Sequence, residues 1–169
     1  DRPLSRGLGD VYKRQPKYIN DIIVPAVIEG AKKSGRDPKE CELLWGGFIA
    51  TGESEEDLQI AKRNVAARIS FYASTRTYRP ALEFHGWEEI NEALHKLSVE
   101  GKWEEMFSLV TDEMVETLGF CGTGEEVANA LKDNLSPICS AAMWNEVEHL
   151  GVDHSRDDHV GNLIQIAKG

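Results

Sequence analysis

Residues 41–52 read CELLWGGFIATG, a short and mostly apolar run that is bounded by turn-forming residues. A run of this length with little alternation is typical of a β-strand buried on both faces, as in a parallel sheet. Gly46 and Gly47 interrupt the run, and glycine weakens a strand but permits close approach of neighbouring backbone or of a ligand. The stretch therefore predicts one buried strand, and the segments around it decide the fold.

The stretch GESEEDLQIAKRNVAARISFYAS, residues 52–74, follows this strand and predicts a long, capped helix. Ser54 is a favourable N-cap, and the acidic residues that follow it suit the positive end of a helix dipole. Phe71 and Tyr72 are expected to complete the inward apolar stripe of this helix, while Lys62 stays outside. The full stripe recurs at spacings of three and four residues and consists of Leu58, Ala61, Val65, Ile69 and Tyr72.

A second helix is predicted before the strand, over residues 17–34. Pro25 is expected to kink or split it, and Gly35 to end it. Its predicted apolar face consists of Ile19, Ile22, Ile23, Ala26 and Val27.

Further helices are predicted after the long one. Thr123 and Glu126 form a T-x-x-E capping box that opens a helix over 122–135, which Pro137 ends. We place a candidate strand at 138–144 and a candidate final helix around 160–167. Before the capping box, three short amphipathic helices form a helical excursion over 87–101, 102–110 and 111–119.

The alternation of strand and helix favours an α/β fold with parallel strands. Two strands do not form a stable sheet alone, so the pattern requires further strands.

Composition restricts the classes of partner. The chain has 169 residues, 41% of them hydrophobic and 28% charged, with a net charge of −10. A field of this sign repels phosphate backbones and anionic lipid surfaces, so nucleic acid and membranes are not expected as partners. No apolar window is long enough to span a bilayer. Three cysteines without metal-ligand spacing indicate a reducing, cytoplasmic setting.

Residues 1–15, DRPLSRGLGDVYKRQ, differ from the rest of the chain. They carry four basic and two acidic residues, a net charge of +2, and have no helical or strand period. The segment resembles translated adapter sequence from metagenome assembly, and we predict that it is a non-native leader. The alternative is a genuine disordered tail. If residues 1–15 are a non-native leader, residues 16–169 are expected to be the C-terminal part of a longer protein.

Three stretches resemble one known family. They are PKYINDIIVPAVIEGAKKSGRDP, FIATGESEEDLQIAKRNVAARISFYASTRTYRPALEFHGW and CGTGEEVANAL, which lie within residues 16–133. They are similar to the C-terminal part of the luciferase-like monooxygenases, and most similar to the branch that depends on the deazaflavin coenzyme F-420. The resemblance implies the C-terminal portion of a TIM (β/α)8 barrel with a helical insertion, which is helix-rich as a fragment.

The resemblance also implies an activity. Members transfer hydride or oxygen to a small organic substrate at a flavin or deazaflavin, which the C-terminal mouth of the barrel holds. Coenzyme F-420 is the expected cofactor and FMN the alternative, and the full-length parent is a possible homodimer. Catalytic residues are expected on earlier strands, so the fragment alone is expected to be inactive. The rival interpretation is a standalone helical protein-interaction module without catalysis, with Trp87, Trp103 and Trp144 as anchors.

Two turns are candidates for cofactor binding. Thr51 and Gly52 follow the predicted strand, and the turn at Thr123 and Gly124 precedes a helix whose first N–H groups are able to hold an anion. Each turn also has a purely structural interpretation, as a βα turn and as a helix cap. Glu53 and the acidic residues after it disfavour a phosphate at the first turn.

The aromatic run at residues 71–87 supplies four more candidates. Tyr78, Arg79, His85 and Trp87 are residue types that interfaces favour. Three roles remain open for them: anchoring the helical excursion, contacting a second subunit, or lining a substrate pocket.

No metal site is predicted. The histidines and acids around residues 149–159 match no metal-ligand spacing and predict a solvated loop. Cys121 has no histidine near it in sequence, so no nucleophile is assigned.

Overall fold

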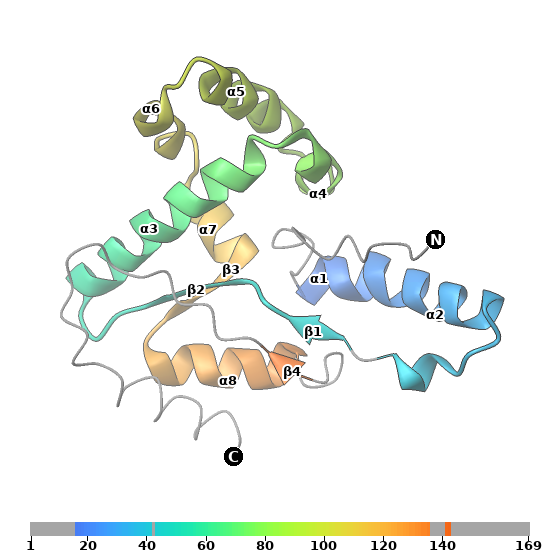
Figure 1. Cartoon of the computed structure of the whole chain (residues 1–169). Coiled ribbons are helices and arrows are strands. Elements are labelled where there is room, and N and C mark those ends of the chain that lie inside the picture. Colours follow the sequence, from blue (N-terminus) through green and yellow to red (C-terminus); the bar gives the residue numbers. More distant parts are fainter. Residues whose placement is uncertain (1–15, 42, 136–140, 143–169) are drawn as a thin grey trace.

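The computed structural model describes residues 16–41, 43–135 and 141–142 (Figure 1). The elements are α1 (Pro16–Tyr18), the π-helix η2 (Ile19–Ile23), α2 (Val24–Lys33), the 3-10 helix η3 (Pro38–Glu40), β1 (Leu44–Trp45), β2 (Phe48–Thr51), α3 (Glu55–Ala73), the 3-10 helix η4 (Arg76–Tyr78), α4 (Arg79–Glu83), α5 (Glu88–Val99), α6 (Trp103–Phe107), α7 (Asp112–Leu118), β3 (Gly119–Gly122), α8 (Gly124–Leu135) and β4 (Ala141–Ala142).

The strands pair in parallel, as the sequence predicts. β2 pairs with β3, with Phe48 opposite Gly119 and Thr51 opposite Gly122. β1 pairs with β4 in a second two-stranded sheet. The single strand predicted at residues 41–52 is divided in two, because Gly46 and Gly47 lie between β1 and β2 and belong to neither strand.

Helices cover both faces of the β2–β3 sheet, with α3 and α7 on one side and α8 on the other (Figure 1). Alternate strand residues point to opposite faces. Phe48 and Ala50 belong to the larger core cluster, with α3, α5 and α7. Ile49 belongs to a smaller cluster, with Trp45 and with residues of α8 and η2. The described residues thus form a helix-rich, three-layer arrangement around a small parallel sheet, which is consistent with the predicted fragment of a (β/α)8 barrel.

The N-terminal helix begins with a π turn, in which the N–H of Val24 donates to the carbonyl of Ile19. Pro25 then lies in the first turn of α2, where its missing N–H is tolerated. The change of helical period rotates the predicted apolar face, so Ile22 and Ala26 are exposed while Ile19 is buried. Gly35 ends α2 with a φ of 71°, as predicted.

The long helix α3 begins as predicted, because the Asp57 N–H donates to the Ser54 side chain. Two predictions about its faces are wrong. Phe71 is 56% exposed and does not complete the inward stripe, because Tyr72 and Ala73 occupy the inward positions of the last turn. The Lys62 side chain is only 11% exposed, because it packs between α3 and α7 with its ammonium 2.6 Å from Glu116.

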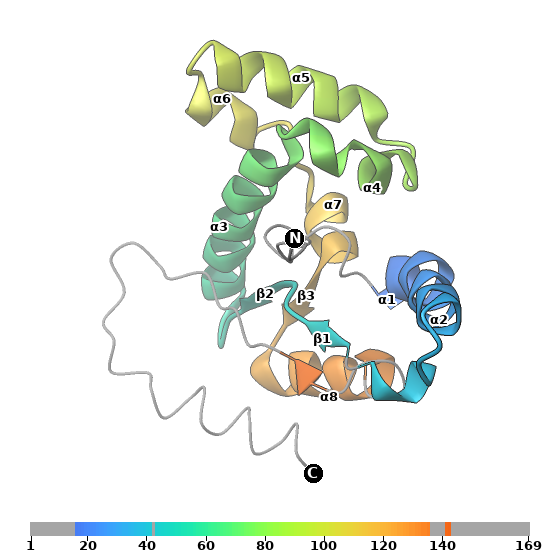
Figure 2. The same cartoon turned by 45° about the vertical axis from the view of Figure 1, so that its right-hand side comes forward.

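The three helices of the predicted excursion are present as α5, α6 and α7, and α4 precedes them. α4, α5 and α6 lie across the C-terminal end of α3, whereas α7 lies beside α3 and next to β3 (Figure 2). Asn91 of α5 is buried, and its amide donates to the Ala73 and Thr75 carbonyls that end α3. This side chain therefore fixes α5 to the end of α3.

No strand was predicted at the position of β3, whereas the candidate strand predicted at 138–144 contains β4. The predicted leader at 1–15, the final helix around 160–167 and the polar loop at 149–159 lie outside the described residues. Among the helices that the structure describes, none combines the length and apolar character needed to cross a membrane.

Candidate functional site

The two candidate turns lie side by side at the carboxyl edge of the β2–β3 sheet. Thr51 pairs with Gly122, and the Gly52 N–H donates to the Gly122 carbonyl over 3.4 Å. Thr123 and Gly124 follow directly, so the structure brings all four predicted cofactor-binding residues together. Parallel strands place their carboxyl ends on one edge, which is why residues some 70 positions apart in sequence meet here.

At Thr51 and Gly52 the path of the backbone, rather than an exposed side chain, determines the shape of the turn. Thr51 is only 3% exposed. A Cβ on Gly52 would lie 2.3 Å from the backbone nitrogen of Leu58, so no side chain fits between β2 and the first turn of α3. Gly52 is therefore a packing requirement of this β–α turn.

The start of α8 carries the predicted capping box. The Thr123 N–H donates to Glu126 Oε2 over 2.8 Å, and the Glu126 N–H donates to Thr123 Oγ1 over 3.3 Å. The carboxylate of Glu126 therefore occupies the place where an external anion would meet the Thr123 N–H. The N–H groups of Gly124 and Glu125 have no hydrogen bond among the described residues.

Carboxylates surround both helix starts. Ser54 Oγ lies 2.8 Å from Asp57 Oδ2 at the start of α3. Glu53 and Glu125 are exposed beside the two turns. The field of this edge is negative, which favours neutral hydrogen-bonding groups over phosphate.

The capping box predicts a pH dependence. Hydrogen bonds from the Thr123 N–H and hydroxyl lower the pKa of Glu126 below its ordinary value of 4.5. The ionised carboxylate therefore stabilises the folded state above pH 4.5, and this stabilisation is lost as the pH falls through the lowered pKa. Glu126→Gln keeps an acceptor but does not titrate, so it should lower stability at pH 7 and reduce the loss between pH 5 and pH 2. Urea unfolding across this range measures the effect.

The matched control for this prediction is Glu125→Gln, which removes a neighbouring charge but none of the capping-box hydrogen bonds. An identical pH profile for Glu126→Gln and the unchanged protein would contradict the role given to the carboxylate.

The aromatic candidates lie at the other end of α3. This helix has 19 residues, which corresponds to a length of about 28 Å. Tyr78 is buried and its ring meets the Tyr72 ring edge-on, with 5.8 Å between centroids. Arg79 pairs with Glu83 and Glu92 on the surface. The described geometry therefore separates these residues from the two βα turns.

His85 and Trp87 form a stacked pair between α4 and α5, with ring centroids 4.8 Å apart. Burial, followed by the nearby Lys17 ammonium, lowers the pKa of His85. Lys17 lies 5.0 Å from the Phe84 ring, and the Tyr18 ring meets Phe84 edge-on. These contacts join α1 to the turn after α4. Of the three roles considered for the aromatic run, this arrangement fits the anchoring of the helical excursion.

Cys121 lies on β3 near Lys62. Burial raises the pKa of its thiol to about 11, although the Lys62 ammonium opposes this change. The thiol stays protonated at neutral pH, so Cys121 is a poor nucleophile. Within the described residues, no three histidine, cysteine or acidic side chains converge on a possible metal position.

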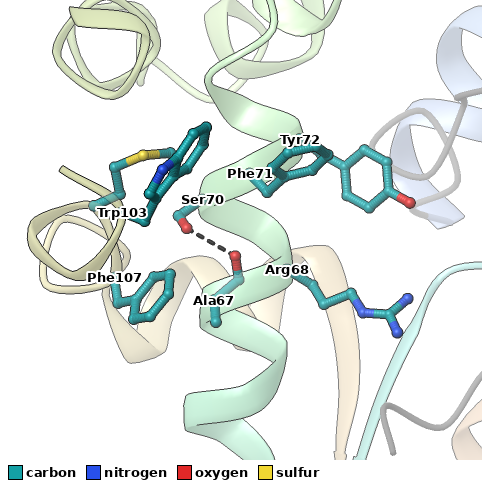
Figure 3. Close-up of a pocket in the computed structure, with 8 residues that line it drawn as sticks. Ala67, Arg68, Ser70, Phe71, Tyr72, Trp103 and Phe107 are labelled. Atoms are coloured by element: carbon teal, nitrogen blue, oxygen red, sulfur yellow. Dashed lines mark hydrogen bonds between the residues drawn. The ribbon is translucent and has the colours of Figure 1, made fainter. Parts of the chain in front are cut away.

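A groove that was not predicted from the sequence lies between α3 and α6 (Figure 3). This aromatic groove is an open hollow of about 430 Å³, lined by Ala67, Arg68, Ser70, Phe71, Tyr72, Trp103, Met106 and Phe107. The aromatic rings of this groove come from α3 and α6. The groove was not expected, because Phe71 was predicted to point into the core. The spacing of Trp103 and Phe107, one helical turn apart, is the signal that was available.

The parallel β–α units, with adjacent turns at one edge, define an α/β fold. The chain matches the family described as luciferase-like monooxygenase over residues 8–137, and it belongs to that family. Members of this family fold as TIM barrels.

Similar proteins occur in mycobacteria. The chain is 36% identical over 133 residues to uncharacterised proteins of Mycobacterium bovis and of two Mycobacterium tuberculosis strains. The match covers 75% of this chain and 39% of each relative, so the chain spans about two fifths of their length. No solved structure matches the chain.

Proposed function

We propose that this chain is part of an oxidoreductase that uses coenzyme F-420, or alternatively FMN, to act on a small organic substrate. The supporting observation is the meeting of the Thr51–Gly52 and Thr123–Gly124 turns at one sheet edge, in a chain of the luciferase-like family. In TIM barrels this edge carries the active site, and the turns after the last strands contribute to it.

The residues of this edge fit part of such a cofactor. Gly124 and Glu125 offer backbone N–H donors for the polar edge of a flavin-type ring, whereas the Thr123 hydroxyl donates to Glu126 Oε2 and keeps only acceptor capacity. The carboxylates of Glu53 and Glu126 oppose a phosphate at the same place. The bound cofactor supplies the hydride-transfer chemistry, and these residues orient its ring.

Other parts of a complete barrel would supply the catalytic groups and the phosphate site. Each sheet of the described residues has two strands, whereas a barrel needs eight. We therefore expect this chain alone to have no turnover.

Cys41 and Cys121 are free thiols, which supports a cytoplasmic setting.

The test uses a chimera in which residues 16–135 replace the matching segment of the Mycobacterium tuberculosis relative. The unchanged relative is the control. Fluorescence titration with coenzyme F-420 and with FMN, in separate experiments, reports which cofactor binds. We expect binding of coenzyme F-420 by both proteins. If the relative binds a cofactor and the folded chimera binds neither, the proposed role of this edge is wrong.

A further inference from the structure

The turn between α4 and α5 contains a histidine nitrogen that is buried without a partner. Within the described part of the chain, Nε2 of His85 is the buried side-chain atom that makes no hydrogen bond. Buried polar groups are nearly always hydrogen-bonded, so this exception needs a physical reason. A neutral ring can carry a lone pair at Nε2, whereas a protonated ring would bury an N–H that has no acceptor.

Aromatic packing, rather than hydrogen bonding, places the His85 ring. The ring stacks on Trp87, with centroids 4.8 Å apart and planes inclined by 24°. It also meets the Phe84 ring edge-on, with 5.0 Å between centroids and an angle of 84°. All three side chains are partly buried. Contacts of this kind hold a neutral ring without a polar partner, which accounts for the unpaired Nε2.

The Phe84 ring connects His85 to the N-terminal helix. The Lys17 ammonium lies 5.0 Å from the centroid of the Phe84 ring, which is within the range of a cation–π contact. The Tyr18 ring meets the same Phe84 ring edge-on at 5.4 Å. One ring therefore contacts both side chains from α1 and the histidine that follows it in the chain.

We propose that His85 is a pH-sensitive latch: its neutral ring completes the contact between α1 and the turn after α4, and its protonation opens that contact. The proton would add a second positive charge beside the ring that holds the Lys17 ammonium, and like charges at short range repel. The buried Nε2–H would also need an acceptor, which water supplies only when the ring leaves the stack. This inference does not depend on the proposed cofactor.

The charged groups around His85 favour its neutral form. Burial, followed by the Lys17 ammonium of α1, lowers the pKa of His85 below its ordinary value of 6.5. The charged side chains of the two flanking helices are exposed, and the basic one among them is already paired with acids. They are Arg79 and Glu83 of α4, with Glu88, Glu89 and Glu92 of α5.

The Trp87 ring acts in the opposite direction, because an indole face attracts a cation. This attraction is small beside the cost of burying a charge without a hydrogen-bond partner, so the protonated ring should move to solvent. The sign of the pH dependence follows. The neutral ring stabilises the folded state above pH 6.5, and this stabilisation is lost as the pH falls through the lowered pKa of His85.

An NMR titration of the 169-residue chain between about pH 8 and about pH 4 tests the latch. We expect the His85 ring to titrate with a midpoint below 6.5, and the Tyr18 ring resonances to shift with the same midpoint. The Tyr18 hydroxyl does not ionise in this range, so its shift reports the contact with Phe84. Tyr18→Phe and His85→Phe assign the two sets of resonances.

Three variants separate the latch from a general effect of acid. His85→Phe keeps an aromatic ring but takes up no proton, so the Tyr18 resonances should become independent of pH. Lys17→Met removes the charge but keeps an unbranched side chain, so the His85 midpoint should rise toward 6.5. Lys32→Met is the matched control, because Lys32 is exposed in the last turn of α2, and it should leave the midpoint unchanged. Circular dichroism verifies that each variant is folded.

A His85 midpoint at or above 6.5 would overturn the proposal. Tyr18 resonances that stay constant while His85 titrates would overturn it too, as would a Tyr18 shift that persists in folded His85→Phe. If His85→Phe does not fold, equal midpoints in Lys17→Met and Lys32→Met would still contradict the role given to the Lys17 charge. A shared midpoint that rises in Lys17→Met alone supports the latch.

Discussion

Replacing Gly52 with alanine is expected to lower the free energy of unfolding by about 3 kcal/mol, the upper part of the range for overpacking. The added methyl group would lie 2.3 Å from the backbone nitrogen of Leu58 and 2.8 Å from the carbonyl carbon of Asp57. These are backbone atoms at the start of α3, so no side-chain rotation relieves the clash. The helix must shift away from β2, and urea unfolding measures the loss.

Gly30→Ala is the matched control for this prediction. Gly30 lies inside α2, and a Cβ added there has nothing within 4 Å. Alanine favours a helix interior over glycine, so this change should raise stability by about 1 kcal/mol. Equal stability of the Gly52→Ala protein and the unchanged protein would show that β2 and α3 do not approach as closely as described.

The Gly52 site also bears on the proposed function. A displaced α3 moves the Thr51–Gly52 turn relative to the Thr123–Gly124 turn. In the chimera with the mycobacterial relative, Gly52→Ala should therefore weaken cofactor binding even at temperatures where the protein remains folded. Gly30→Ala should leave that binding unchanged, because α2 is remote from the two turns in sequence and does not supply their residues.

Local signals in the sequence predicted most of the helices. The capping box at Thr123 and Glu126 and the N-cap at Ser54 are confirmed, since each depends on side chains within three residues. The three excursion helices are also confirmed. Each of these elements has its own apolar period, and α3, α7 and α8 also have a side-chain cap, so no distant contact was needed to recognise them.

The errors arose where distant contacts decide the structure. β3 has the sequence GFCG, which has neither β-branched residues nor apolar alternation, and it becomes a strand because it pairs with β2. Phe71 fits the period of α3 nearly as well as Tyr72, but the position of α6 leaves it in the groove. The π turn before Val24 lies next to Pro25, where a kink or split was predicted, but the local pattern did not specify the π turn that moves Ile22 to the surface.

The candidate site was predictable in its members but not in its geometry. Thr51 and Gly52, like Thr123 and Gly124, were selected because each pair follows a strand or opens a helix. Their proximity follows from the parallel pairing of β2 with β3, and no strand was predicted at residues 119–122. The family match over residues 8–137 adds the class of chemistry, which no local pattern of this chain specifies.

The second large effect is expected from Trp45→Ala, which should lower the free energy of unfolding by about 3–5 kcal/mol. Trp45 is 1% exposed, and its ring meets the Phe120 ring at 5.3 Å and 66°. It joins β1 to the smaller core cluster, whose other buried members are Ile19, Ile49, Val127 and Leu131. Truncation to alanine leaves a cavity between the sheet and α8, and the surroundings refill such a cavity only in part.

Leu44→Ala is the control for Trp45→Ala, because the neighbouring Leu44 is 57% exposed and its loss should change stability by about 0.5 kcal/mol or less. The two core clusters make a finer prediction possible. Hydrogen exchange in the Trp45→Ala protein should accelerate more in α8 and α2 than in α5, because α5 belongs to the larger cluster on the other face of the sheet. Equal acceleration everywhere would mean that the two faces unfold as one unit. Faster exchange confined to α8 and α2 would mean that the layer formed by α8 opens separately, as the three-layer arrangement predicts.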